Sequence, residues 1–302
     1  MPLPRFLRNK KKLHRVLSVW YRRNARPFPW RKTSDPYRIL VSEIMAQQTR
    51  IDRVEARYPV FLKEFPGLGA LAGAPRSAVV RAWRGMGYNS RAIRLHELAQ
   101  RIGNSPTGKL PETPEELLGL PGIGPYTAHA IACFAFGRRV PIVDTNIRRI
   151  IERLSGRRLK EPDLWSTAEL LLPPRKFNEW NQALMDLGAL VCTANSPSCG
   201  ACPFAPECRS AFSVRKSKSR RPKSEPGRNG IPNRIYRGRI VEALRDHPRG
   251  QSVRLKPLAS KIGIPITAGN LEWLTALLTR LEKDGLVSVR RRRDSVSARL
   301  AD

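Results

Sequence analysis

The chain has 302 residues, of which 41% are apolar and 27% charged, so it can bury a core and is not wholly disordered. Lys and Arg number 56 against 25 Asp and Glu, which gives a formal net charge of +31. This excess predicts a polyanionic partner, either a nucleic acid or an anionic membrane surface. No uncharged apolar run reaches the ~18 residues of a membrane span, which excludes an integral membrane protein. No secretion signal is visible either, so we expect a cytoplasmic protein.

Helical periodicity dominates the chain up to about residue 190. An amphipathic helix is predicted within residues 1–27, and the proline-rich run at 26–30 ends it. One long helix is predicted over 37–58. Further helices are predicted over 75–85, 89–103, 114–119, 125–136, 145–155, 162–172 and 175–190. Because no alternating strand pattern interrupts them, residues 1–208 are predicted to form an all-α domain.

The remaining chain has a different composition. Residues 209–234 carry nine Lys or Arg and one Glu with almost nothing to bury, which indicates a basic linker. Folded patterns resume over residues 235–302, with helices expected at 235–246, 258–262 and 271–284. Two strands, 285–289 and 295–300, are expected around the four arginines 290–293. Three helices and a basic hairpin resemble a winged-helix module that binds DNA.

Four of the five cysteines lie close together in the sequence, in the spacing Cys192-x6-Cys199-x2-Cys202-x5-Cys208. Clustered thiolates bind either zinc or an iron–sulfur cluster. Zinc ribbons usually use two CxxC pairs, whereas this chain has one, flanked by longer loops. The spacing therefore favours one [4Fe–4S] cluster per chain. The fifth cysteine, Cys133, lies in an apolar helical stretch and is expected to be ordinary core.

A glycine turn between two predicted helices reads LPGIGPYTA over residues 120–128. Gly122 and Gly124 permit a tight turn with open backbone amides, and Pro125 is a favoured first residue of the next helix. Open amides at a helix N-terminus bind anions, so a DNA phosphate fits here. The whole string resembles the helix-hairpin-helix of DNA glycosylases.

The order of motifs extends this resemblance to residues 13–210. The glycine turn is followed first by Asp144, in the string VDTNIRR, and then by the cysteine group that begins at Cys192. This order resembles the endonuclease III and MutY branch of the helix-hairpin-helix superfamily. Tyr126 stands where bifunctional lyases of that branch carry a Schiff-base lysine. The strings FPWR (28–31) and PYRILVSEIMAQQT (36–49) resemble adenine glycosylases of the MutY type.

Two carboxylates are the candidate catalytic groups. Glu43 lies in an apolar helical stretch, and such surroundings raise a carboxyl pKa toward that of a general acid. A lone helical Glu is more often a surface residue, and Asp144 taken alone could be a plain helix cap. The resemblance implies instead that Glu43 protonates N7 of adenine and that Asp144 stabilises the oxocarbenium ion. It also implies that Tyr126 and Asn146 position this machinery.

The resemblance further implies base flipping and a monofunctional mechanism. Gln48 and Tyr88 would insert near the opposite guanine or 8-oxoguanine, while Trp30 and Arg31 would line the adenine pocket. Tyr88 could equally be a core ring that follows a glycine turn. The expected partner is double-stranded DNA with A·8-oxoguanine or A·G mispairs, bound by a monomer in a prokaryotic, nucleoid-associated setting.

Several departures limit the resemblance. Family members usually carry Leu at Ala46, Tyr at Asn89 and Gly at Thr145. The segment after the linker, 235–302, is short and has no Nudix box, so the usual domain that inspects 8-oxoguanine is missing or replaced. Two other functions therefore stay open. One is a mismatch thymine or uracil glycosylase on the same scaffold, and the other is a winged-helix regulator that retains an inactive glycosylase domain.

Overall fold

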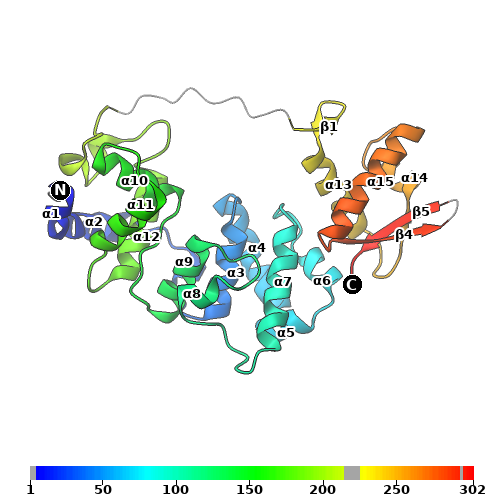
Figure 1. Cartoon of the computed structure of the whole chain (residues 1–302), viewed down its shortest axis with the longest axis horizontal. Coiled ribbons are helices and arrows are strands. Elements are labelled where there is room, and N and C mark those ends of the chain that lie inside the picture. The colour runs from blue at the N-terminus through cyan, green and yellow to red at the C-terminus, as the bar shows by residue number, and fades with distance from the viewer. Residues whose placement is uncertain (1–4, 214–224, 293–294) are drawn as a thin grey trace. The chain divides into compact units, whose positions relative to one another are not determined.

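The computed structural model describes residues 5–213, 225–292 and 295–302. The chain divides into two compact units, and each contains segments from distant parts of the sequence. The first comprises Met1–Ile39, Pro111–Gly119 and Ile123–Arg220, and the second Leu40–Leu110, Leu120–Gly122 and Arg221–Asp302. Helices dominate both units, and the only larger sheet in the described residues is near the C-terminus (Figure 1). The predicted fold class, mostly helical with a small C-terminal module, is confirmed. None of the helices within the described ranges is long and apolar enough to cross a membrane.

The first unit is built around three packed helices, α2, α10 and α12. Leu13 and Leu17 of α2 are fully buried in its core, as the apolar period of that segment predicts. Its elements are α1 (Arg5–Arg8), α2 (Lys10–Asn24), η1 (Pro29–Arg31), α8 (Pro114–Leu117), α9 (Pro125–Phe136), α10 (Thr145–Ser155), α11 (Glu161–Leu171), α12 (Phe177–Leu190), η2 (Cys199–Ala201) and η3 (Ala205–Glu207).

Helices α9 and α10 begin and end where the sequence predicts, because local signals fix both ends. Pro125 starts α9, and Gly137 ends it in the left-handed conformation with φ 62°. Asp144 caps α10, and Gly156 ends it with φ 71°.

The helical part of the second unit corrects the prediction of one long helix over 37–58. The segment forms two helices, α3 (Pro36–Ala46) and α4 (Ile51–Glu64), separated by a turn in which Gln48 has φ 53°. The buried Arg91 donates to the carbonyls of Ile44, Met45 and Gln47, which a continuous helix would use internally. The other helices are α5 (Leu68–Gly73), which the sequence did not indicate, α6 (Arg76–Ala82) and α7 (Ser90–Gly103).

The C-terminal part of the second unit has the element order of a winged helix. It contains α13 (Asn233–Arg245), β3 (Val253–Arg254), α14 (Leu255–Lys261), α15 (Ala268–Lys283), β4 (Val287–Arg292) and β5 (Ser295–Leu300). The antiparallel sheet has the order β3-β5-β4, with Val289 opposite Ala298. We call residues 235–302, which include all of α13 but its first two residues, the C-terminal module.

Two features of the C-terminal third were not predicted. Strand β3 is too short to give an alternating pattern, and a hairpin of β1 (Gly227–Arg228) and β2 (Ile231–Pro232) lies inside the segment expected as linker. Residues 214–224 of that segment, and Arg293 of the predicted arginine run, lie outside the described residues.

Candidate active site and cysteine pocket

Glu43 lies in the middle of α3, within the second unit. It is only 7% exposed, and its helix neighbours Leu40, Val41, Ile44 and Met45 are almost completely buried. The side chain of Glu43 is therefore largely shielded from solvent.

Asp144 is the N-cap of α10 in the first unit. Its carboxylate accepts a hydrogen bond from the backbone N–H of Ile147 at 2.6 Å and from Asn146 Nδ2 at 2.9 Å. Burial raises the pKa of Asp144 above its ordinary value, although these hydrogen bonds pull the pKa down. The two bonds fix the direction of a carboxylate at the positive end of a helix dipole.

A polar chain links Asp144 to the first of the clustered cysteines. Arg149 donates to Asn146 Oδ1 at 2.7 Å and to the carbonyls of Gly188 and Cys192, both also at 2.7 Å. A Cβ at Gly188 would lie 2.5 Å from Asn146 Cβ, so only glycine lets α12 approach α10 this closely. Sequence reasoning missed Arg149 and Gly188, because their roles depend on the contact between α10 and α12.

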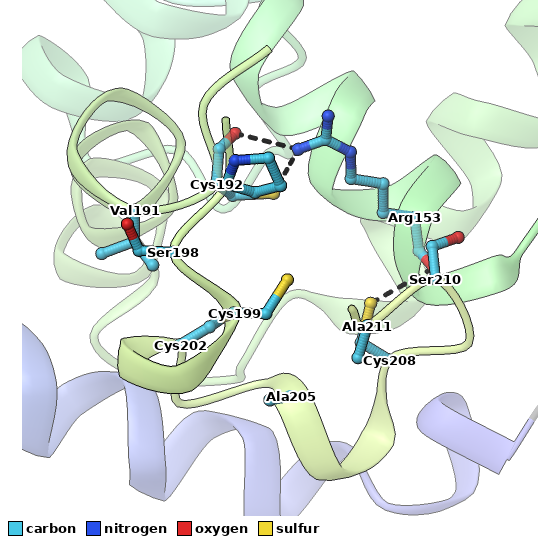
Figure 2. Close-up of a pocket in the computed structure, with 11 residues that line it drawn as sticks. Arg153, Val191, Cys192, Ser198, Cys199, Cys202, Ala205, Cys208, Ser210 and Ala211 are labelled. Carbon is cyan, nitrogen blue, oxygen red and sulfur yellow. Dashed lines mark hydrogen bonds between the residues drawn. The ribbon is translucent and has the colours of Figure 1, made fainter. Parts of the chain in front are cut away.

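The four cysteines predicted as ligands line one pocket. Figure 2 shows their side chains around it, with Arg153 from α10 on one side. Arg153 Nη1 lies 3.2 Å from Cys192 Sγ and 2.7 Å from the Thr193 carbonyl. The spacing along the chain therefore does bring the four thiols together.

Among the described residues, no group of three or more His, Cys, Asp or Glu could hold a metal ion as it stands. Burial raises the pKa of Cys202 to about 11 and also raises that of Cys208. The loop is tied to the N-terminal helices through Glu207, which pairs with Lys12 at 3.0 Å and accepts from Asn9 at 2.9 Å.

The glycine turn before α9 is built by two different glycines. Gly122 has φ +78°, and a Cβ there would lie 3.0 Å from Arg94 Cβ, so both conformation and space require glycine. Gly124 has φ −103°, which any residue can adopt, and a Cβ there would meet open space. Gly124 is the N-cap of α9 without a side-chain cap, and Tyr126 packs against the core of the first unit.

Gln48 and Tyr88 occupy two loops that a single buried arginine holds together. Both have left-handed backbones, with φ 53° and 43°, which is uncommon for residues other than glycine. Arg91 donates to carbonyls at the end of α3 and also to Met86 O at 3.0 Å and Gly87 O at 3.2 Å. The Tyr88 ring is 57% exposed, so it is not a core ring. Burial lowers the pKa of Arg91 to about 10.

Trp30 and Arg31 lie in η1 of the first unit. The Trp30 ring stacks on Phe28 at 4.9 Å between centroids. The Arg31 guanidinium forms a two-pronged ion pair with the buried Asp186, at 2.7 and 2.9 Å. Burial of Asp186 opposes its ionisation, but the bonds from Arg31 and Arg26 outweigh this and hold its pKa below the ordinary value. Sequence reasoning missed Asp186.

The predicted site residues divide between the two units. The first unit contains Asp144, Asn146, Tyr126, Gly124, Trp30, Arg31 and the four cysteines. The second unit contains Glu43, Gln48, Tyr88 and Gly122. Within the first unit, α10 joins the carboxylate to the cysteine pocket. Within the second, Arg91 joins the two loops.

Comparison with known proteins identifies the family. Residues 41–171 match the model of the HhH-GPD superfamily of base excision DNA repair proteins. The adenine DNA glycosylase of Mycolicibacterium smegmatis is 42% identical over 237 residues, which cover 76% of this chain and 79% of that protein. The thymine/uracil-DNA glycosylase of Methanothermobacter thermautotrophicus is 34% identical, over 65% of this chain and 90% of that protein.

A solved structure agrees with these sequence matches. A thermostable thymine-DNA glycosylase superposes with a TM-score of 0.65 and 32% identity, over 68% of this chain and 98% of that one. The identity to the mycobacterial enzyme is the higher, and it extends over more of the present chain. The chain therefore belongs to the HhH-GPD superfamily of base excision DNA repair proteins and, within it, to the MutY-like adenine DNA glycosylases.

Proposed function

We propose that this DNA glycosylase removes adenine that is paired with 8-oxoguanine or guanine in double-stranded DNA. The observation that carries this proposal is the 42% identity to an adenine DNA glycosylase over 79% of that protein's length. The two candidate carboxylates support it. Glu43 is buried, and Asp144 is held at a helix N-terminus by two hydrogen bonds.

The proposed reaction is hydrolysis of the N-glycosidic bond. Glu43 donates its proton to N7 of adenine, so that the electron pair of the breaking C1′–N9 bond can move into the base. Asp144, ionised, stabilises the positive charge that develops on the sugar, and water then adds to C1′. Tyr126 and Asn146 position these groups. Because Tyr126 supplies no amine, we propose a monofunctional mechanism without a Schiff base.

The remaining site residues are proposed to bind and open the duplex. Gln48 and Tyr88 enter the DNA duplex beside the opposite base. Both residues have a left-handed backbone conformation in their loops. Trp30 forms a wall of the adenine pocket, with Arg31 anchoring its turn on Asp186. The amides at Gly122 and Gly124 would bind a backbone phosphate, since α9 has no side-chain cap at its N-terminus.

We propose that the cysteine pocket holds one [4Fe–4S] cluster. The four thiols line one pocket. Their spacing, with one CxxC pair flanked by longer loops instead of the two pairs usual in zinc ribbons, favours a cluster over zinc. Cys192, Cys199, Cys202 and Cys208 would each ligate one iron, and the bound cluster would chiefly stabilise the loop.

We also propose how the chain is divided into domains and in which oligomeric state it acts. Residues 1–208 form the glycosylase domain, 209–234 a basic linker and 235–302 a winged-helix-like module that adds DNA affinity. The protein acts as a monomer on DNA.

The proposed substrate can be tested with labelled duplexes that carry A·8-oxoguanine, A·G, T·G or U·G. After incubation, alkali cleaves the abasic sites. Excision of adenine from the first two duplexes supports the proposal, whereas excision confined to T·G or U·G would establish the thymine or uracil alternative. Absence of all excision by a DNA-binding chain would favour a regulator. Glu43→Gln should bind duplex normally and lose roughly 10²–10⁴-fold in excision rate.

A further inference from the structure

The C-terminal module packs on the helices that carry the Tyr88 loop, all within the second unit. Val80 of α6 and Ile93 of α7 are buried in the same hydrophobic cluster as the module's Tyr236 and Ile240. Polar contacts frame this cluster. Arg84 pairs with Glu242 at 2.8 Å and with Asp246 at 2.6 Å, at the end of α13. The module and these helices therefore share one core.

Arg245, the last residue of α13, reaches from the module into this shared region. It is only 6% exposed, which is unusual for an arginine. Its Nε donates to Val80 O at 3.0 Å, and its Nη1 pairs with Glu242 at 2.8 Å. Its Nη2 donates to Asn89 Oδ1 at 2.9 Å. Each polar edge of the guanidinium thus has a fixed partner.

Asn89 follows Tyr88 directly, and its side chain does not cap the helix that begins after it. It stands at the N-cap of α7, where Asn typically accepts a bond from the first turn, yet it makes no side-chain cap bond. Its oxygen accepts from Arg245 instead. Arg91, Thr49 and Trp83 donate to carbonyls in the first part of the loop of residues 85–89, whereas Arg245 holds its last residue, Asn89.

We propose that Arg245 is a positioning residue for opposite-base recognition. It fixes Asn89 and thereby keeps Tyr88 in the left-handed, outward-directed conformation. A strained backbone persists only while its surroundings hold it. Without the bond, the loop would occupy the binding conformation for a smaller fraction of the time, and the apparent affinity would fall by that fraction. This inference rests on the proposed role of Tyr88.

The test uses the full chain, three variants and one control variant. Asn89→Ala removes only the acceptor, Arg245→Met removes the donor and keeps a long side chain, and the double variant removes both. Arg84→Met is the matched control, because it breaks exposed ion pairs between the segment after α6 and α13, one of them to the Glu242 that also pairs with Arg245, without contacting Asn89. The probe is an A·8-oxoguanine duplex made uncleavable by a 2′-fluoro group on the adenosine. The dissociation constant is compared with that for a fully paired duplex.

We expect each single variant to lower the preference for the mispair about tenfold, as for the removal of one charged hydrogen bond. The double variant should lose no more than the larger single loss, because both substitutions break the same bond. The excision rate at saturating enzyme should be unchanged, since the loop only presents Tyr88. Arg84→Met should stay within twofold of the wild type. If Arg245→Met fails to fold, Asn89→Ala alone carries the test.

An unchanged preference in Asn89→Ala would overturn the inference, as would an equal loss in Arg84→Met, which would indicate general docking. These outcomes differ from failure of the proposed function. In that case the wild-type chain itself would excise no adenine from A·8-oxoguanine or A·G duplexes.

Discussion

The Asp144 region and the Arg91 region hold their polar side chains in different ways. Asp144 is fixed mainly by its own helix, through the Ile147 amide and the Asn146 side chain in the first turn. Arg91 instead joins segments that are distant in the sequence, reaching Met45 O at 2.8 Å and Thr49 Oγ1 at 2.7 Å. A substitution at Asp144 should therefore lower the excision rate and leave the folding free energy nearly unchanged. A substitution at Arg91 should chiefly lower the folding free energy.

The largest effect is expected from Asp144→Asn. Asn is as good an N-cap as Asp, so α10 should remain intact. The substitution removes the negative charge that stabilises the sugar cation, and excision should fall roughly 10²–10³-fold. Single-turnover excision and thermal unfolding should be measured together. A large drop in melting temperature would show that Asp144 is chiefly a structural cap.

Arg91→Met should have the opposite signature. Its removal takes the Arg91 donor away from the buried carbonyls of Ile44 and Met45 at the end of α3, which should cost about 3 kcal/mol or more of folding free energy. Urea unfolding measures this loss. Arg94→Met, an exposed position on the same helix, is the control and should change stability by less than about 0.5 kcal/mol. Equal losses in the two variants would refute the central role of Arg91.

The cysteine loop tests a third kind of restraint. Cys199→Ser should remove one proposed ligand, so that iron content falls from about four per chain and the loop loses its support. The variant protein should be poorly soluble, because Phe204 in the same loop belongs to the core of the first unit. Metal analysis of anaerobically prepared wild-type protein is the reference. Stoichiometric zinc without iron would contradict the cluster.

Asn146→Ala should give a smaller change that is visible only as a function of pH. Asp144 must be ionised to act, and the bond from Asn146 favours the ionised form. Without that bond the pKa of Asp144 rises further, so the acid limb of the excision rate should move to higher pH. The rate well above that limb should change little. Thr145→Ala, exposed in the same turn, should leave the profile in place.

The smallest effect concerns the basic strand β4. Arg290 and Arg292 are exposed, and removing one contact to a DNA phosphate should lower the salt slope of log K by about 0.9. Arg291 serves as the control, because Glu282 already binds it at 3.0 Å. Binding titrations at several salt concentrations would show the difference. An unchanged slope in Arg290→Ala and Arg292→Ala would mean that this strand does not contact DNA.

Local sequence was sufficient where neighbouring residues decide the structure. Proline at the start and glycine at the end gave the bounds of α9, and the Asp144 cap gave the start of α10. The cysteine spacing predicted that four thiols would meet, and they line one pocket. These features depend on contacts between residues that are close in the sequence. Residue propensities and motif spacing are therefore sufficient to predict them.

Tertiary structure decided the rest, because the deciding contacts come from distant segments. The break between α3 and α4 follows from Arg91, which comes from a helix much later in the chain. Gly188 is needed only because Asn146 packs against it, and the side-chain oxygen of Asn89 accepts from Arg245, which comes from another part of the chain. The residues next to a side chain in the sequence do not indicate which distant residue it will contact. Once the chain is packed, however, each buried polar group must find a partner.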